Sequence, residues 1–284
     1  MNGRRLVLVL AGIVLTCGLP VCSDNTPLVD PPYSGLDISA ATDSTVRIEW
    51  VSRPGEAGFG CSRHEVFADS FFVQFREAGA VSWRLLGNTE STEWTHDPQG
   101  MTGDYSVSIW FGDSLYDDCY SPQSTEPVRT PAALVAELNG AGSAGYGWAG
   151  GHWEAHMYSM RDTASAKQAD LYLTDFAAGY QGPDYFLASP SLGPGDLGEG
   201  VPQADWRESR FAAALADGGT PSPVLEPQAY SDRFAIDGLP MVVCCHTGDA
   251  HFAQVRVLDV NTAAGTATVE SWYQPIKGLR LVLH

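Results

Sequence analysis

Short runs in which hydrophobic and polar residues alternate recur along the first half of the chain. Residues 45–50 place hydrophobic side chains at every second position, and residues 105–110 repeat the pattern. Runs rich in aromatic and β-branched residues lie between them at 71–76, 82–86 and 91–96. A period of two sends successive side chains to opposite faces of a β-strand. Turns of Gly, Asp and Pro separate the runs, so we predict two antiparallel sheets packed as a β-sandwich.

Strand patterns continue through the second half of the chain with less regular spacing. A glycine-rich segment at 140–151 indicates either a flexible start or a strand that allows close backbone approach. Strands are predicted after it at 152–160, 169–176 and 184–189. The chain ends in a predicted meander with strands at 241–247, 250–260, 266–274 and 279–283.

One helix stands out within this second half. Asp205 is its predicted N-cap, and Glu208 stands at the capping-box position. Phe211 and Leu215 share a helical face, and the glycine pair at 218–219 ends the segment.

These patterns predict a mostly β chain of two domains, which is also the expectation for 284 residues. The first domain is a β-sandwich at 31–131. The second, at 132–284, is a β-rich C-terminal domain with one short helix. Hydrophobic residues make up 44% of the chain, which is enough to build a core in each domain.

The first 22 residues have the pattern of a secretory signal. Arg4 and Arg5 precede an apolar run at 6–16, which is shorter than the about 20 residues that a membrane-spanning helix needs. Pro20 then breaks the helix ahead of a cleavage site. We therefore expect the mature chain to be exported, with residues 23–30 as a polar tether.

Two cysteines follow the apolar run, and the sequence favours the second as a lipidation site. Lipoprotein signals place a Leu-like residue three positions before the modified cysteine, and Leu19 stands there relative to Cys22. Lipidation at Cys17 and a signal without a lipid are the alternatives. A chain anchored through Cys22 belongs to the bacterial cell envelope, at the outer membrane or cell surface. Without the lipid it is periplasmic or secreted.

The net charge of −18 limits the partners of the chain. Only two lysines occur, Lys167 and Lys277. Such a surface repels phosphate backbones and anionic lipids, so nucleic acid is not an expected partner. Membrane contact is expected only through the N-terminal lipid. The expected partner is an unknown protein or glycan at the cell surface.

The segment 31–131 resembles a fibronectin type III module. Trp50 falls where that family keeps its core tryptophan, at the end of the second strand. Tyr105 opens a Tyr-x-Val-x-Ile strand, where the family keeps its corner tyrosine. The chain departs from the family at 101–104, just upstream of this tyrosine, and in a long loop at 52–70. The resemblance implies an interaction or spacer module without chemistry of its own.

Cys61 and Cys119 lie in loops that such a sandwich places at the same end. Cys61 follows the second strand, and Cys119 follows the strand that Tyr105 opens. Because an exported chain can keep a disulfide, we predict a bridge between these two cysteines. Two free thiols are the alternative.

The C-terminal tail is similar to the end of HmuY-type haem-binding envelope lipoproteins. The similarity covers residues 247–254, which contain a Gly/Asp turn, and the Trp-Tyr-Gln sequence at 272–274. Gln254 stands in place of a lysine of that family. The family binds haem through histidines in the middle of its domain, and this chain has none between Leu171 and Cys245. The resemblance implies a shared shape, with haem or metal capture as an alternative function.

Residues 152–160 contain one candidate metal site. The zinc-protease spacing His-Glu-x-x-His is absent. On a strand, His152, Glu154 and His156 share one face, with the histidines about 13 Å apart at ~3.3 Å per residue. The two histidines are therefore too far apart to share one ion. A neighbouring histidine and glutamate could still form a metal site with a ligand from another strand.

A second candidate metal site lies at a tight turn near the C-terminus. His246 and His251 flank this turn, next to Cys244 and Cys245. Thiolates beside imidazoles suit zinc or copper. Adjacent strand residues point to opposite faces, however. We therefore expect one core cysteine and one exposed thiol, or a vicinal disulfide.

No pattern in the sequence specifies an enzyme site. Gly-x-Ser-x-Gly elbows, phosphate loops and dinucleotide fingerprints are absent. Acidic residues are plentiful, so a secreted hydrolase with an unidentified carboxylate site is an alternative. We predict an exported cell-envelope binding protein with no enzymatic activity and no cofactor.

Overall fold

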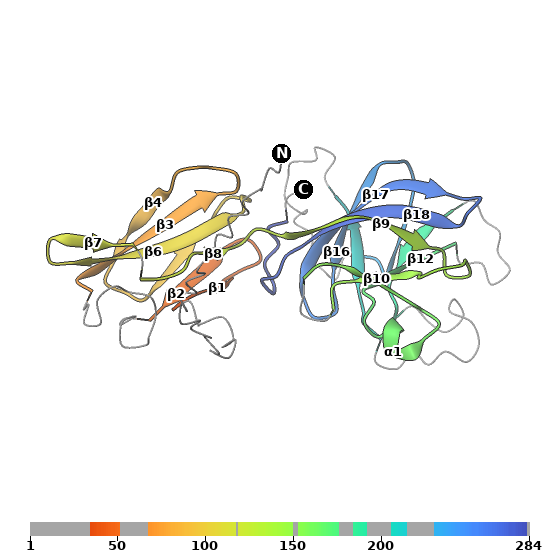
Figure 1. Cartoon of the computed structure of the whole chain (residues 1–284), viewed down its shortest axis with the longest axis horizontal. Coiled ribbons are helices and arrows are strands. Elements are labelled where there is room, and N and C mark those ends of the chain that lie inside the picture. Colours follow the sequence, from red (N-terminus) through yellow and green to blue (C-terminus); the bar gives the residue numbers. More distant parts are fainter. Residues whose placement is uncertain are drawn as a thin grey trace, which may run out of the picture. The chain divides into compact units, whose positions relative to one another are not determined.

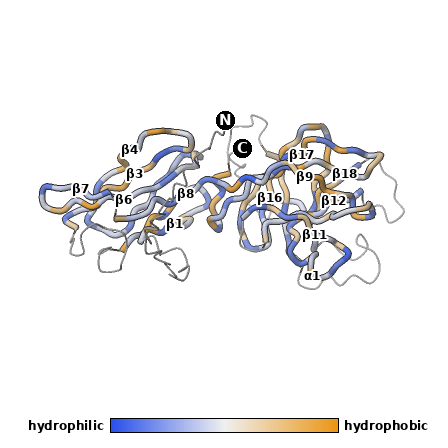
Figure 2. The backbone as a smooth tube through the Cα atoms, in the orientation of Figure 1, coloured by the Kyte–Doolittle hydropathy of each residue, from blue (hydrophilic) through white to orange (hydrophobic). Residues whose placement is uncertain are grey.

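The computed structural model describes residues 35–51, 68–117, 119–149, 153–175, 184–191, 206–214 and 230–282. These residues form antiparallel sheets and one short helix, α1 (Thr163–Ala166), so the predicted mostly β fold class is confirmed (Figure 1). Hydrophobic stretches lie along strands such as β12 (Leu171–Thr174) and β17 (Phe252–Asn261) (Figure 2). No helix within the described ranges is long and apolar enough to cross a membrane.

The strands β1 to β8 form two sheets, which we call the N-terminal sandwich. One sheet has the strand order β1-β2-β5, with β1 (Leu36–Ala40), β2 (Val46–Trp50) and β5 (Glu93–His96). The other has the order β4-β3-β6-β7, with β3 (Ser70–Glu77), β4 (Arg84–Thr89), β6 (Gly103–Phe111) and β7 (Ser114–Tyr116). A short strand, β8 (Gln123–Ser124), also pairs with β6. The five alternating or aromatic runs of the sequence therefore all contain strands, and β1, β7 and β8 are additional.

The alternation explains the core of the N-terminal sandwich. Every second residue of β2 is buried, and so is every second residue of β3. The Tyr105 hydroxyl lies 2.8 Å from Nδ1 of His96, which joins the core to β5. Gly87 lets the Trp94 ring of β5 cover β4, because a Cβ at Gly87 would lie 2.6 Å from that ring.

The strands β9 to β18 form two further sheets, which we call the C-terminal sheets. One has the order β14-β16-β17-β18-β9, with β9 (Val128–Ala136), β14 (Arg210–Ala213), β16 (Met241–His246) and β18 (Thr266–Tyr273). The other has the order β11-β10-β12-β13-β15, with β10 (Gly145–Gly147), β11 (His156–Tyr158), β13 (Phe186–Ala188) and β15 (Arg233–Ala235). One buried cluster takes side chains from both sheets, so the two sheets pack against each other.

The glycine-rich segment at 140–151 contains a strand with close backbone contacts, in agreement with one of the two interpretations of its sequence. A Cβ at Gly147 would lie 2.5 Å from the backbone nitrogen of Asp170. A Cβ at Gly145 would lie 2.8 Å from the sulfur of Met160. Glycine is therefore required here by space, and β10 can lie tightly between its neighbours.

Pro131 lies inside β9, and the expected junction between residues 131 and 132 therefore falls within a strand. β9 is an edge strand, where the missing N–H of a proline is tolerated. The register with β18 also shifts between Val269 and Ser271, opposite this part of β9.

The predicted helix around residues 205–215 is wrong for the part that the structure describes. Residues 210–213 form β14, which pairs with β16 from Arg210↔His246 to Ala213↔Val243. Phe211 and Ala212 are both buried although they are adjacent. A strand buries adjacent residues on opposite faces, whereas a helix presents one stripe to a core. Pairing with the edge of β16 therefore overrides the local capping signals.

The end of the chain does not form the predicted strand within residues 279–282. Leu279 and Leu281 are instead buried in the core of the N-terminal sandwich. The backbone N–H of Arg280 donates to the carbonyl of Asp43 at 2.7 Å, and its guanidinium pairs with the Asp43 carboxylate at 3.0 Å. All these residues belong to the unit Tyr33–His284. The apolar tail thus completes a core that begins some 240 residues earlier in the chain.

Candidate functional site

The histidines predicted as metal ligands lie on separate elements. His152 is outside the described residues. Glu154 lies in a bend, and the strand begins only at His156, so residues 152–160 are not one strand. The His246 ring packs against the Phe252 ring, with 4.9 Å between the ring centroids. Within the described ranges, no three His, Cys, Asp or Glu residues are placed to hold a metal ion.

Both cysteines of the predicted C-terminal cluster are buried, and they are not joined by a disulfide. Cys245 belongs to the core between the C-terminal sheets, and burial raises the pKa of its thiol. Cys244 points to the opposite face, where it packs against Ala212 and Tyr230. The expected exposed thiol is therefore covered, because Tyr230 and the side chain of Ala212 on the neighbouring strand β14 pack against it.

Cys22 and Cys61 lie outside the described residues. Cys119 is buried in the core of the N-terminal sandwich. The lipid anchor and the Cys61–Cys119 bridge stay predictions.

A stack of aromatic rings at the C-terminal sheets is the strongest candidate site. Tyr273 stacks on Trp148 at 5.4 Å, on Trp153 at 5.8 Å and on His251 at 5.1 Å between ring centroids. The three interplanar angles are 23°, 17° and 23°. Trp148 and Tyr273 are buried, whereas Trp153 is 39% exposed. We call Trp153, Tyr273 and His251 the aromatic shelf, with Trp148 in the core beside them.

Three separate segments position the aromatic shelf. Tyr273 ends β18, and His251 follows the turn between β16 and β17. The Thr247 hydroxyl accepts a hydrogen bond from the His251 N–H at 3.1 Å, which closes this turn. Trp153 has φ +58°, a left-handed conformation that is unusual for a bulky residue and costs about 1–3 kcal/mol. Its ring contacts must therefore hold it in place.

An ionic network lies beside the shelf, with Asp170 fully buried and Asp249 43% exposed. The Asp170 carboxylate accepts hydrogen bonds from Arg207 Nε at 2.5 Å and from the Trp148 backbone N–H at 2.8 Å. Arg207 also contacts Asp249 at 2.8 Å, and Asp249 accepts from the Thr247 hydroxyl at 2.5 Å. The network joins the start of β12, the segment before β14 and the β16–β17 turn.

The charges of this network act on one another and on Tyr273. Burial raises the pKa of Asp170, and the Arg207 guanidinium opposes that shift. Burial alone would also raise the pKa of Asp249, but hydrogen bonds from Thr247 and Arg207 outweigh burial and lower it. Burial raises the pKa of Tyr273, and the nearby Asp249 and Asp170 charges raise it further. The Tyr273 phenol is therefore protonated at neutral pH and can donate a hydrogen bond.

Two polar atoms of the shelf have no partner in the described part of the chain. No hydrogen bond there involves the Tyr273 hydroxyl. Nδ1 of His251 lies 3.0 Å from the Gln274 carbonyl, which can only accept, so Nδ1 carries a hydrogen. In the neutral ring, Nε2 of His251 is then an acceptor, and it makes no hydrogen bond within the same residues. Neither atom is among the fully buried polar atoms that lack a partner in the described residues, so both reach solvent and are open to water or a ligand.

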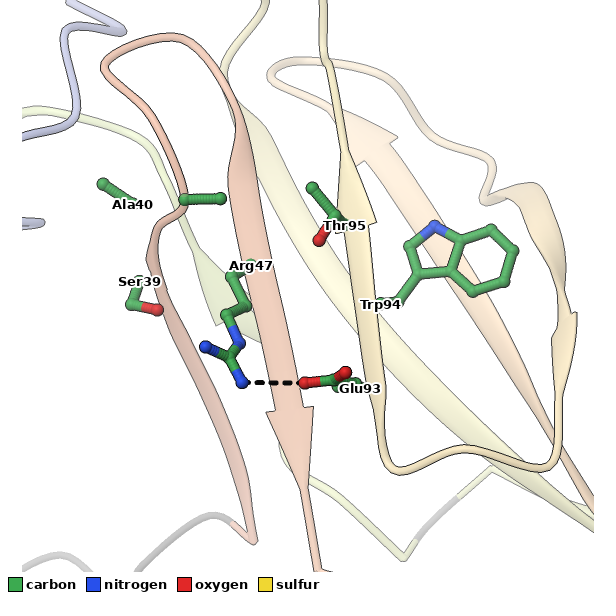
Figure 3. A pocket seen from close by; sticks show the side chains of 7 residues that line it. Ser39, Ala40, Arg47, Glu93, Trp94 and Thr95 are labelled. Atoms are coloured by element: carbon green, nitrogen blue, oxygen red, sulfur yellow. Dashed lines mark hydrogen bonds and ion pairs between the residues drawn. The ribbon is translucent and has the colours of Figure 1, made fainter.

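A hollow with a volume of about 670 Å³ lies on the outer face of the β1-β2-β5 sheet. Arg47 and Glu93 point toward each other across it at 2.7 Å, whereas the Trp94 ring lies on the far side of its strand (Figure 3). Arg47 also pairs with Glu49 at 2.9 Å. The charged groups of this hollow satisfy one another and are about half-exposed, which makes it a weaker candidate than the shelf.

The sequence contains only part of the signal for this site. His251 is a predicted candidate, and Trp153 lies within the His-Trp-Glu-Ala-His motif that is predicted as a candidate metal site. Tyr273, Asp170 and Arg207 are not predicted, since they come from distant segments. Arg207 in particular lies in the predicted helix, where it would be a surface residue.

Comparison with known proteins assigns no family. No family model matches the chain, and no curated protein matches it. Among solved structures, a DUF4466 family protein from Parabacteroides merdae is similar with a TM-score of 0.41 and 12% identity. The match covers 81% of this chain and 90% of that chain. A similarity of this degree carries no argument about function.

Proposed function

We propose that this chain is an exported binding protein of the cell envelope and that its ligand contacts the aromatic shelf. The observation that carries the proposal is the exposed Trp153 ring, held in an unusual conformation against a buried stack. Exposed aromatic rings with one polar atom are favoured at binding surfaces, because they bury a large area and lose little conformational freedom.

Binding is favoured over hydrolysis by the state of the nearby carboxylates. Asp170 is fully buried, and both of its oxygens already accept hydrogen bonds. Asp249 is likewise engaged by Arg207 and Thr247. A hydrolytic acid or base must reach the proton that it transfers. The network instead holds the β16–β17 turn, and with it His251, in place.

The proposed location rests on the N-terminal signal, with an anchor at Cys22 and the N-terminal sandwich as a fibronectin type III-like spacer. Mass spectrometry of the mature N-terminus tests the anchor. The expected end is an acylated Cys22, and an unmodified end beyond residue 22 would remove the anchor but leave export standing.

The binding proposal is tested with isolated envelopes of the source bacterium. The purified mature chain is expected to sediment with them, and Trp153→Ala is expected to abolish most of this binding. Trp110→Ala is the matched control, because Trp110 is a similarly exposed tryptophan, at 36%, on the N-terminal sandwich. Equal binding by both variants and the parent chain would overturn the proposal.

Haem capture, the alternative implied by the tail resemblance, is separated by a titration with hemin. If the ligand of the aromatic shelf is not haem, hemin is expected to give no Soret shift that depends on His251. A Soret shift lost in His251→Ala would favour haem instead.

A further inference from the structure

We infer that the ligand of the aromatic shelf is a neutral carbohydrate, an inference that rests on the proposed function. Three observations support it: the geometry of the rings, the unpaired polar atoms and the local charge. Sugars combine flat patches of C–H groups with a rim of hydroxyls, and each observation corresponds to one part of that chemistry.

The ring geometry favours a flat ligand that stacks. Trp153 and Tyr273 are nearly parallel at 17°, as are His251 and Tyr273 at 23°. Trp153 is 39% exposed, so part of its ring stays accessible to a ligand. A quaternary ammonium ligand needs several rings that surround it as walls. The shelf lacks this arrangement among the described residues, so stacking on one face is the favoured mode.

The unpaired polar atoms favour a ligand with hydroxyl groups. The Tyr273 phenol can donate or accept a hydrogen bond, and Nε2 of His251 can accept one. A hydroxyl can donate to His251 and accept from Tyr273, whereas a purely aromatic ligand would leave both groups unpaired. A ligand that covers these two groups without pairing them removes their hydrogen bonds to water, which reduces affinity, so a hydroxyl-bearing ring fits better.

The local charge favours a neutral ligand over an acidic one. Asp170, Arg207 and Asp249 place two carboxylates against one guanidinium beside the shelf. This network carries one net negative charge, and the chain as a whole carries −18. Phosphorylated and acidic sugars would therefore be repelled.

The test measures binding of soluble hexasaccharides to the purified mature chain by calorimetry. The neutral probes are gluco-, manno-, xylo- and galacto-hexaose, and hexagalacturonic acid is the acidic probe. At least one neutral probe is expected to bind and the acidic probe is not. Trp153→Ala is expected to weaken binding about 10-fold or more, while Trp110→Ala leaves it unchanged. Tyr273→Phe removes only the hydroxyl and is expected to cost about 2- to 10-fold.

The envelope experiment separates failure of this inference from failure of the proposed function. Binding that depends on Trp153 and is lost after periodate treatment of the envelopes supports a carbohydrate. Binding that depends on Trp153 but is lost after protease treatment keeps the proposed function and overturns the carbohydrate. Binding of the acidic probe alone also overturns the inference. Envelope binding that is unchanged in Trp153→Ala overturns both proposals. A loss of binding supports them only where the thermal melting of this variant matches that of the parent chain.

Discussion

Arg207 Nε lies 2.5 Å from a carboxylate oxygen of Asp170, a side chain with no solvent exposure. The two residues are distant in sequence, and Arg207 extends the link to Asp249 in the β16–β17 turn. The C-terminal sheets therefore contain a buried charge whose only described cationic partner is Arg207.

Removing that partner is expected to be costly. Arg207→Met leaves Asp170 as an uncompensated buried charge, which should lower the free energy of unfolding by about 3–5 kcal/mol. Asp170→Asn combined with Arg207→Met should recover part of the loss. Urea denaturation measures both. The control is Arg210→Met at an exposed position, which should lower the free energy of unfolding by about 1 kcal/mol or less. Equal losses at the two arginines would contradict the role of Arg207.

The stability of the N-terminal sandwich is expected to fall on mild acidification. Burial lowers the pKa of His96, and the nearby Arg84 charge lowers it further. The Asp97 charge raises this pKa, but by less. The unfolded chain thus binds a proton near pH 6.5 while the folded chain does not, so stability is lost as the pH falls below about 6.5.

His96→Gln keeps a group that can pair with Tyr105 and removes the titration. Its urea midpoint should depend less on pH than that of the parent chain between about pH 7.5 and 5.5. Burial also lowers the pKa of His246, so some pH dependence should remain. Identical slopes for parent and variant would refute a contribution of His96.

The C-terminal tail is expected to stabilise the N-terminal sandwich. Leu281→Ala opens a cavity in that core and should cost about 2–5 kcal/mol. Hydrogen exchange should then rise in β2 and β6, which contribute to the same core. Leu239→Ala, at a 44% exposed position, is the control. Unchanged exchange in β2 and β6 would show that the tail contributes no stability there.

A disulfide between Cys61 and Cys119 is expected in the exported chain. Peptide mapping without reduction should find the two cysteines in one linked peptide. Cys61→Ser should lower the free energy of unfolding by about 4 kcal/mol by the loop-entropy estimate. Alkylation of both thiols in the folded, unreduced protein would show instead that they are free.

The sequence by itself determines the strands that alternate and the turns that join neighbouring strands. Val46, Ile48 and Trp50 repeat at the period of a strand, and the same local rule predicts β6 and the β16–β17–β18 meander. Each of these signals needs only a few consecutive residues.

Tertiary structure decides the features that depend on a distant partner. β14 replaces a predicted helix because the edge of β16 supplies its hydrogen bonds, which the capping signals near Glu208 cannot reveal. Leu281 does not extend the meander, because it packs in the core of the N-terminal sandwich, whose strands lie far away in the sequence. The aromatic shelf likewise forms only when β18 brings Tyr273 against Trp153, 120 positions earlier in the chain. The periodicity of a sequence predicts which face of a strand a residue lies on. It does not predict which other segment packs against that face.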